Sequence, residues 1–171
     1  TQNRINTGMK VSSAKDSGAI FSIATAQRAT AASQDAVRSG LQRTQSITDV
    51  ALAAGDTITS ALEEQKGLAV SIAGSTGAAQ TSYLAEYNAI GTEIASALAG
   101  ATFDGVNLYK ANAAAITVQT GASTSYTLKA IAGADTAVAT TTAAVAGDAA
   151  TIVATVDSAI TAFTSVLSDF G

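Results

Sequence analysis

Three segments of this chain place apolar residues at alternating spacings of three and four, and that repeat constrains the fold more than any other feature. The spacing puts the apolar side chains on one stripe of an α-helix, the seam along which coiled-coil helices pack. No proline occurs among the 171 residues to interrupt such helices. We therefore predict a mainly α fold, an elongated antiparallel three-helix coiled-coil bundle.

Each predicted seam belongs to one helix. In chain order, the seams are Ile47, Ala51, Ala54, Ile58, Ala61, Gln65, Leu68 and Ile72; then Tyr83, Tyr87, Ile90, Ile94, Ala97 and Ala101; and last Ala149, Val153, Val156, Ile160, Phe163, Leu167 and Phe170. Upstream of the first seam, a weaker stripe runs through Ile20, Ile23, Ala26, Val37 and Leu41. A continuous first helix would be roughly 80 Å long and would need partners along its length.

The seams and the breaks between them predict one domain, residues 1–171, with four parts. These parts are residues 1–74 (the long N-terminal helix and its lead-in), 75–101 (the second helix), 102–148 (a β-hairpin and an Ala/Thr-rich connection) and 149–171 (the C-terminal helix). The Gly-Ser-Thr-Gly run at 74–77 reverses the chain between the first two helices. Asp148 is the predicted N-cap of the C-terminal helix.

Between the second and third helices, the apolar period changes from helical to alternating. Residues 116–119 and 126–129 alternate apolar with polar side chains, and Gly121-Ala122-Ser123 lies between them. That pattern predicts a β-hairpin with a loose turn. Residues 130–148 are nearly featureless in sequence, and we expect a short strand or an irregular loop there.

The composition favours contacts with neighbouring molecules. Alanine accounts for 40 of the 171 residues and charged residues for only 13%, so much of the surface consists of Ala, Ser and Thr. Such a surface is more natural where the flanks of a molecule meet neighbours. The net charge of −4 and the lack of a Lys/Arg cluster argue against nucleic acid as a partner. No apolar run reaches the roughly 18 residues that would predict a membrane span.

Charge is unevenly distributed along the chain. The basic residues Arg28, Arg38, Arg43 and Lys66 come early, whereas residues 130–171 contain four acidic residues and no base. We therefore expect an early helix to pack against the last helix with complementary charges, although exposed pairs contribute little each.

The residue types that most often carry chemistry are missing, because the chain has no cysteine and no histidine. Disulfides, thiolate sites and histidine bases or ligands are thereby excluded. Ser13 and Lys15 could form a Ser/Lys pair, but Ser13 with Asp16 matches a helix capping box better. Glu86 and Glu93 lie two helical turns apart, roughly 10 Å, as is usual for solvated carboxylates. We predict neither an enzyme nor a bound cofactor or metal.

Two further features could be interpreted as sites. Asp104-Gly105-Val106-Asn107 is similar to part of a calcium loop but lacks the other oxygen ligands, so we expect a turn that closes the second helix. Tyr83 and Tyr87 could stack on a ligand, but their spacing of one turn on the seam predicts core residues with hydroxyls at the rim.

Several of these segments resemble bacterial flagellin of the short Gram-negative type, in the order in which that family has them. Residues 4–16 are similar to the family's N-terminal signature and residues 103–108 to its F-[ND]-G-V-x-L turn. Residues 41–58 and 156–171 are similar to the helical stretches that accompany these motifs. The signature positions are Arg4, Gly8, Ser13, Ala14, Lys15, Asp16, Phe103, Gly105, Val106, Asn107 and Leu108.

The resemblance implies the helical core domain of flagellin, called D1, without the terminal D0 helices that drive polymerisation. It implies a subunit that leaves the cell by the flagellar type III route and self-assembles into the extracellular filament used for motility. Its partners would be other flagellin subunits, an export chaperone and a cap protein. Without the D0 helices, we expect the chain as given to be monomeric.

In many flagellins, a segment of pattern L-Q-R-V-R-E-L-A-V contacts the neighbouring protofilament and the innate immune receptor Toll-like receptor 5. Residues 62–70 align with this segment, with Glu64 in place of the first Arg and Gly67 in place of the Glu. The candidate subunit-contact residues are Leu62, Glu63, Glu64, Lys66 and Leu68.

Two alternatives to a filament subunit stay open. A flagellin-like adhesin or polysaccharide-binding protein of the cell surface would bind through residues 109–148, although no aromatic or charged cluster is found there. A hook–filament junction protein typically carries Pro-Ser-Asp-Asp-Pro where this chain has Ser-Ala-Lys-Asp, and this chain has no proline.

The reversed charge at Glu64 and the lost charge at Gly67 predict weak or no activation of Toll-like receptor 5. A reporter-cell assay with the full-length protein measures this, and strong signalling at nanomolar dose would refute the expectation.

Overall fold

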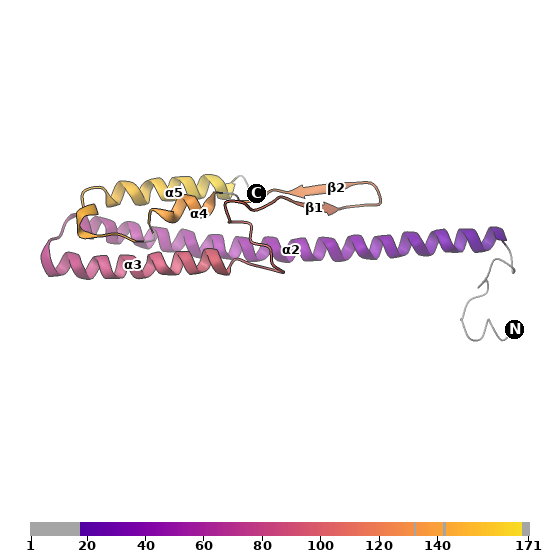
Figure 1. Cartoon of the computed structure of the whole chain (residues 1–171), viewed down its shortest axis with the longest axis horizontal. Helices are drawn as coiled ribbons and strands as arrows, with labels where there is room; N and C mark the ends of the chain where they lie inside the picture. The colour runs from indigo at the N-terminus through magenta and orange to yellow at the C-terminus, as the bar shows by residue number, and fades with distance from the viewer. Residues whose placement is uncertain (1–17, 132, 142, 169–171) are drawn as a thin grey trace. The chain divides into compact units, whose positions relative to one another are not determined.

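The computed structural model describes residues 18–131, 133–141 and 143–168. In chain order, its elements are α2 (Gly18–Ala73), α3 (Gly77–Gly100), β1 (Ile116–Gln119), β2 (Ser125–Leu128), α4 (Ala134–Ala139), the 3₁₀-helix η1 (Ala146–Asp148) and α5 (Ile152–Ser168) (Figure 1). The two strands pair as one antiparallel hairpin. The prediction of a mainly α fold with a small β-hairpin is confirmed.

By its internal contacts, the chain divides into two compact units, which we describe separately. The first consists of residues 1–42 and 118–126, and the second of residues 43–117 and 127–171. Helix α2 is continuous through both units. That residues 1–171 form a single domain stays a prediction.

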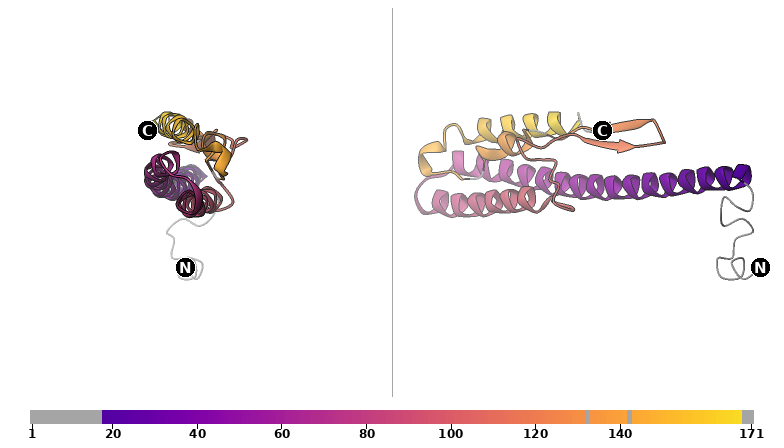
Figure 2. Two further views of the ribbon diagram at one scale, coloured as in Figure 1. Left: turned by 90° about the vertical axis from the view of Figure 1, so that its left-hand side faces the viewer. Right: turned by 45° about the vertical axis from the view of Figure 1, so that its right-hand side comes forward.

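In the second unit, the apolar stripe of α2 forms one side of the core. Figures 1 and 2 show this part of α2 beside α3 and α5, with the short α4 next to α5. The buried residues of the stripe are Ile47, Ala51, Gly55, Ile58, Ala61, Leu62, Gln65, Ala69 and Ile72. The predicted first seam is therefore confirmed, with Ala54 and Leu68 packed at its margin.

The turn between α2 and α3 lies where the glycines predict it. Gly77 has a φ of +65°, a conformation that costs glycine little, and it begins α3. The Nε2 of Gln80 donates to the carbonyl oxygens of Ile72 (3.2 Å) and Ser75 (3.0 Å). The first bond adds a donor to a carbonyl in the last turn of α2, and the second satisfies a carbonyl of the turn itself.

Two tyrosines are buried in the second unit. Tyr109 follows the turn after α3; its hydroxyl donates to the carbonyl of Ala51, and its ring stacks on Phe163 with centroids 6.0 Å apart. Tyr87 lies in α3. Burial raises the pKa of each tyrosine to about 12, and nearby carboxylates add to the effect, Asp56 at Tyr109 and Asp148 at Tyr87.

The predicted seam of the second helix is wrong at its first position. Tyr87 is fully buried as predicted, but Tyr83 is 37% exposed, and Leu84 occupies the core in its place with 8% exposed. Either residue can share a face with Tyr87, being one turn away. Leucine enters the core because a buried tyrosine would also need a partner for its hydroxyl.

The last helix also differs from its prediction at the start. Asp148 does not cap α5; it ends η1, where its Oδ2 accepts a hydrogen bond from the Val145 amide at 2.8 Å. Helix α5 begins at Ile152. The predicted N-cap is therefore wrong, because the aspartate side chain closes a short turn before the helix instead. Phe170, the end of the predicted seam, lies outside the described residues.

The connection before α5 contains the short helix α4, whereas the sequence predicted a short strand or an irregular loop there. Gly133, at a φ of +92°, precedes α4, and Ala134 and Val138 are both fully buried. They are four residues apart and therefore lie on one face of the helix. Six residues are too few to display a helical period in such an Ala/Thr-rich sequence.

In the first unit, the upstream stripe of α2 is largely exposed. Ile20, Ile23 and Leu41 have exposed fractions of 55%, 59% and 43%, and Val37 is half-buried. Within this unit, the described residues that could cover the stripe are 118–126, a segment far shorter than the helix. In this unit, the predicted stripe is therefore not a buried packing surface.

The approach of Tyr109 to α2 requires a glycine at position 55. A Cβ there would lie 2.7 Å from the Tyr109 hydroxyl and 3.2 Å from Leu167 Cδ1, both too close. We expect Gly55→Ala to lower the free energy of unfolding by about 1–3 kcal/mol in urea titrations, as overpacking does. Gly67→Ala, on the same helix with nothing within 4 Å, should instead raise it by about 0.5–1 kcal/mol. Equal effects of the two substitutions would contradict this account.

Candidate functional site

The signature residues at 103–108 form a tight two-residue turn after α3. Phe103 and Val106 bridge each other through both backbone hydrogen bonds, at 3.0 and 2.9 Å. Asp104 and Gly105, between them, both have positive φ, 49° and 76°. That pair matches the mirror-image hairpin turn that favours Asp-Gly. The motif is thus a turn, as predicted, and it presents Phe103 37% exposed.

Asn107 connects this turn to the bundle. Its Nδ2 donates to the carbonyl of Leu98 at 2.7 Å, which satisfies an acceptor in the last turn of α3. Its Oδ1 accepts from the Tyr109 amide at 2.9 Å. Leu108, between them, is 1% exposed. The signature residues Asn107 and Leu108 therefore hold the chain where Tyr109 enters the core.

An ion pair joins the turn to α2. The Arg43 Nε donates to Asp104 Oδ2, and both side chains are about half exposed. Sequence reasoning missed this pair and also missed Tyr109 as an anchor. The available signal was the positive charge at the end of the upstream stripe, but the sequence did not show that the turn folds back beside Arg43.

The remaining signature positions lie outside the described residues. These are Arg4, Gly8, Ser13, Ala14, Lys15 and Asp16, together with the capping box predicted for Ser13 and Asp16.

The candidate subunit-contact residues do not share one environment. Leu62 is 1% exposed and belongs to the core of its own unit, and its role as a subunit contact stays a prediction. Leu68 is half-buried against the core. Glu63 and Glu64 are exposed. Lys66 pairs with Asp157 of α5 at 2.7 Å. The charge complementarity predicted between an early helix and the last helix is thus confirmed at this pair.

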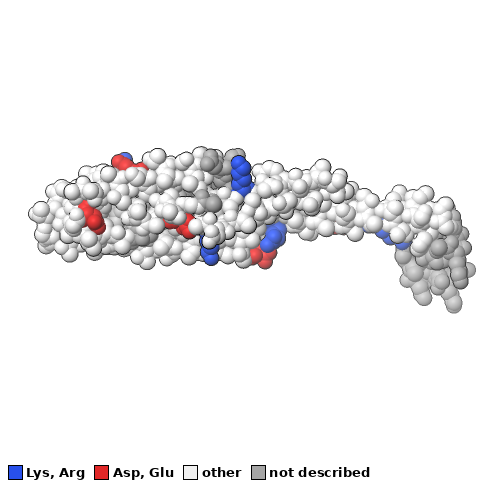
Figure 3. Space-filling model, turned by 45° about the horizontal axis from the view of Figure 1, so that its top comes forward, with Lys and Arg blue, Asp and Glu red and all other residues white. Residues whose placement is uncertain are grey.

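The helix surfaces carry hydroxyl groups whose donors are used within their own helix. Serine and threonine side chains on α2, α3 and α5 donate to the carbonyl four residues earlier. They include Thr48, Thr57, Thr59, Ser60, Ser71, Thr81, Ser82, Thr92, Ser96, Thr155, Thr161 and Thr164. Charged side chains are sparse on the face drawn in Figure 3. A neighbouring molecule could therefore cover such a flank without leaving these donors unsatisfied.

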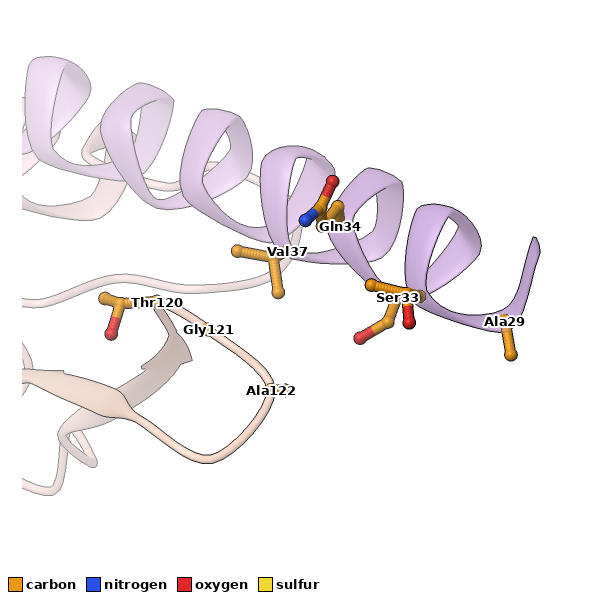
Figure 4. Close-up of a pocket in the computed structure, with 8 residues that line it drawn as sticks. Ala29, Ser33, Gln34, Val37, Thr120, Gly121 and Ala122 are labelled. Carbon is orange, nitrogen blue, oxygen red and sulfur yellow. The ribbon is translucent and has the colours of Figure 1, made fainter. Parts of the chain in front are cut away.

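A shallow cavity of about 470 Å³ lies within the first unit. Figure 4 shows Ser33, Gln34 and Val37 of α2 on one side of it and Thr120–Ala122 of the hairpin tip on the other. The described residues that line it carry no charge. An uncharged, open hollow of this kind offers no catalytic group.

The described residues hold no cluster of three carboxylates, cysteines or histidines that could bind a metal ion. Glu86 and Glu93 are exposed on α3. In the same residues, no helix is long and apolar enough to cross a bilayer.

Comparison with known sequences identifies several relatives. The chain is 47% identical over 109 residues to flagellin FljK and 44% identical over 118 residues to flagellin FljN, both of Caulobacter vibrioides. These matches cover 63% and 68% of this chain but only 40% and 43% of the relatives. A flagellin of Brucella melitensis is 32% identical over 108 residues, 63% of this chain and 38% of its own length. The chain thus spans about two fifths of the curated relatives that it matches. No protein-family model matches it.

Comparison with solved structures also finds a flagellin. The crystal structure of Bacillus cereus flagellin superposes with a TM-score of 0.65 at 26% sequence identity. The similarity covers 79% of this chain and 81% of that structure.

Asn107 provides a direct test of the turn. We expect Asn107→Ala to lower the free energy of unfolding by about 1–3 kcal/mol, because the Leu98 carbonyl and the buried Tyr109 amide both lose their partners. Urea titration followed by circular dichroism measures this. Asn112→Ala, at an exposed position in the following segment, should stay within about 0.5 kcal/mol of the parent. A similar loss in both variants would argue against the role of Asn107.

Proposed function

We propose that the chain is a structural subunit of the bacterial flagellar filament and acts by self-assembly, because it is similar to flagellins in sequence and in fold. The observation that carries this proposal is the joint similarity in sequence and fold, 44–47% identity to the Caulobacter flagellins together with the shared fold of Bacillus cereus flagellin. The order of the matching motifs along the chain agrees with it.

The surface supports an assembling role. The flanks of the second unit are rich in Ala, Ser and Thr, with the hydroxyl donors already satisfied within their helices. Covering such a surface removes few charges from water, so its desolvation costs little. Leu52, Val70 and Phe103 are also 37–57% exposed and would gain from burial between subunits.

The whole protein's partners follow from the family. They are other flagellin subunits in a homopolymer, with an export chaperone and a cap protein during secretion and growth. Its place is the extracellular flagellum, and it is not an enzyme. For subunit contacts in the segment 62–70, Glu63 and Glu64 are the exposed candidates, with Lys66 shared with Asp157.

Expression of the full-length protein in a bacterium that lacks its own flagellins tests the proposal. We expect filaments by electron microscopy and restored swimming. The vector without insert and a secreted, folded variant that lacks the segments outside residues 1–171 serve as controls.

The outcome against the proposal is a full-length protein that is secreted and folded but forms no filament. Binding to surface glycans that is lost on removal of residues 109–148 would then favour the adhesin alternative.

A further inference from the structure

Gln65 is a fully buried polar residue within the apolar stripe of α2, and the core of the second unit divides at its level. The apolar residues group into two clusters, and all three long helices contribute to both. The residues next to the division are Leu62, Ile90 and Ala159 in one cluster and Ala69, Tyr87 and Val156 in the other. The Gln65 amide therefore lies between two apolar clusters.

The Gln65 amide binds two other parts of the chain. Its Nε2 donates to the carbonyl of Tyr87 in α3 at 3.1 Å and to that of Thr141 in the connection at 2.9 Å. Its Oε1 is buried and has no donor among the described residues. A carbonyl oxygen removed from water without a donor is destabilising. An apolar side chain of the same shape would avoid that loss but would take the donor from the Thr141 carbonyl, so the two effects on stability oppose each other.

Asn88 holds the same connection from α3. Its Nδ2 donates to the carbonyl of Ala144 at 3.0 Å, and its Oδ1 accepts from the Ala144 amide at 2.7 Å. From there, hydrogen bonds continue without a gap: the Val145 amide donates to Asp148, and the Thr151 amide donates to the Asp148 carbonyl at 2.9 Å. The position set by α2 and α3 is thus carried to the first turn of α5.

Helix α5 needs such positioning along its axis. Its buried residues are Ile152, Val156, Ala159 and Phe163, at spacings of four and three. A rotation by one residue would turn Asp157 and Thr164 toward the core, so apolar burial sets the rotation of the helix. A shift along the axis by one turn, however, again places apolar residues against α2 and α3, so apolar burial alone separates these registers weakly.

We propose that Gln65, together with Asn88, selects the register of α5 along the bundle. The amide bonds to Thr141 and Ala144 are directional, and they fix the connection that leads into α5 in one position. A single polar residue at an inward-facing coiled-coil position is known to select register at a cost in stability. This role concerns the fold of the subunit and is independent of filament formation.

Pulsed electron resonance between two spin labels tests the proposal. The chain has no cysteine, so Ala85→Cys on α3 and Ser165→Cys on α5, both exposed, give the label sites. We expect one narrow distance in the parent. Gln65→Met should keep the helical content, but the distance distribution should at least double in width or show a second maximum. Asn88→Ala should broaden it as well.

Gln80→Met is the matched control, because Gln80 also donates to two carbonyls but within the α2–α3 turn. It should keep the narrow distribution. A single narrow distance at the parent's value in Gln65→Met would overturn the proposal. Loss of the helical signal in Gln65→Met would also overturn it, since the amide would then be a source of stability.

Discussion

Burial of one apolar stripe of α2, between Ile47 and Ile72, is the interaction on which the second unit depends. The α3 helix, the segment around Tyr109, α4 and α5 contribute side chains to the two clusters that this stripe completes. Apolar burial has no preferred direction, however, so it brings these elements together without fixing where each one stops. Their positions along the stripe need further contacts.

Amide side chains supply those contacts at several points of the second unit. Gln80 donates at the end of α2, Asn107 satisfies the end of α3, and Gln65 and Asn88 hold the connection to α5. Each of them donates to a backbone carbonyl in the last turn of a helix or in a connection between helices. Because an Ala/Thr-rich sequence offers few distinctive side chains for packing, such bonds distinguish one arrangement of the chain from others.

The composition of the chain also suits the molecule to assembly. Threonine and serine hydroxyls donate to their own helices, and the ion pairs Arg43 with Asp104 and Lys66 with Asp157 are about half exposed. The surface thus combines few charges with satisfied donors. In a chain similar to flagellins, these are the properties expected of flanks that neighbouring subunits cover.

The sequence by itself determined the three long helices, the hairpin and the resemblance to flagellin, because apolar spacing and turn residues act locally and leave a readable pattern. It also predicted the buried stripe of α2 and the turn at Asp104-Gly105. Only the tertiary structure decided that Leu84 is buried rather than Tyr83, that Asp148 closes η1, and that Leu62 lies in the core. In each case, neighbouring positions were equally compatible with the local pattern, and the choice was made by partners distant in the chain that no local spacing records.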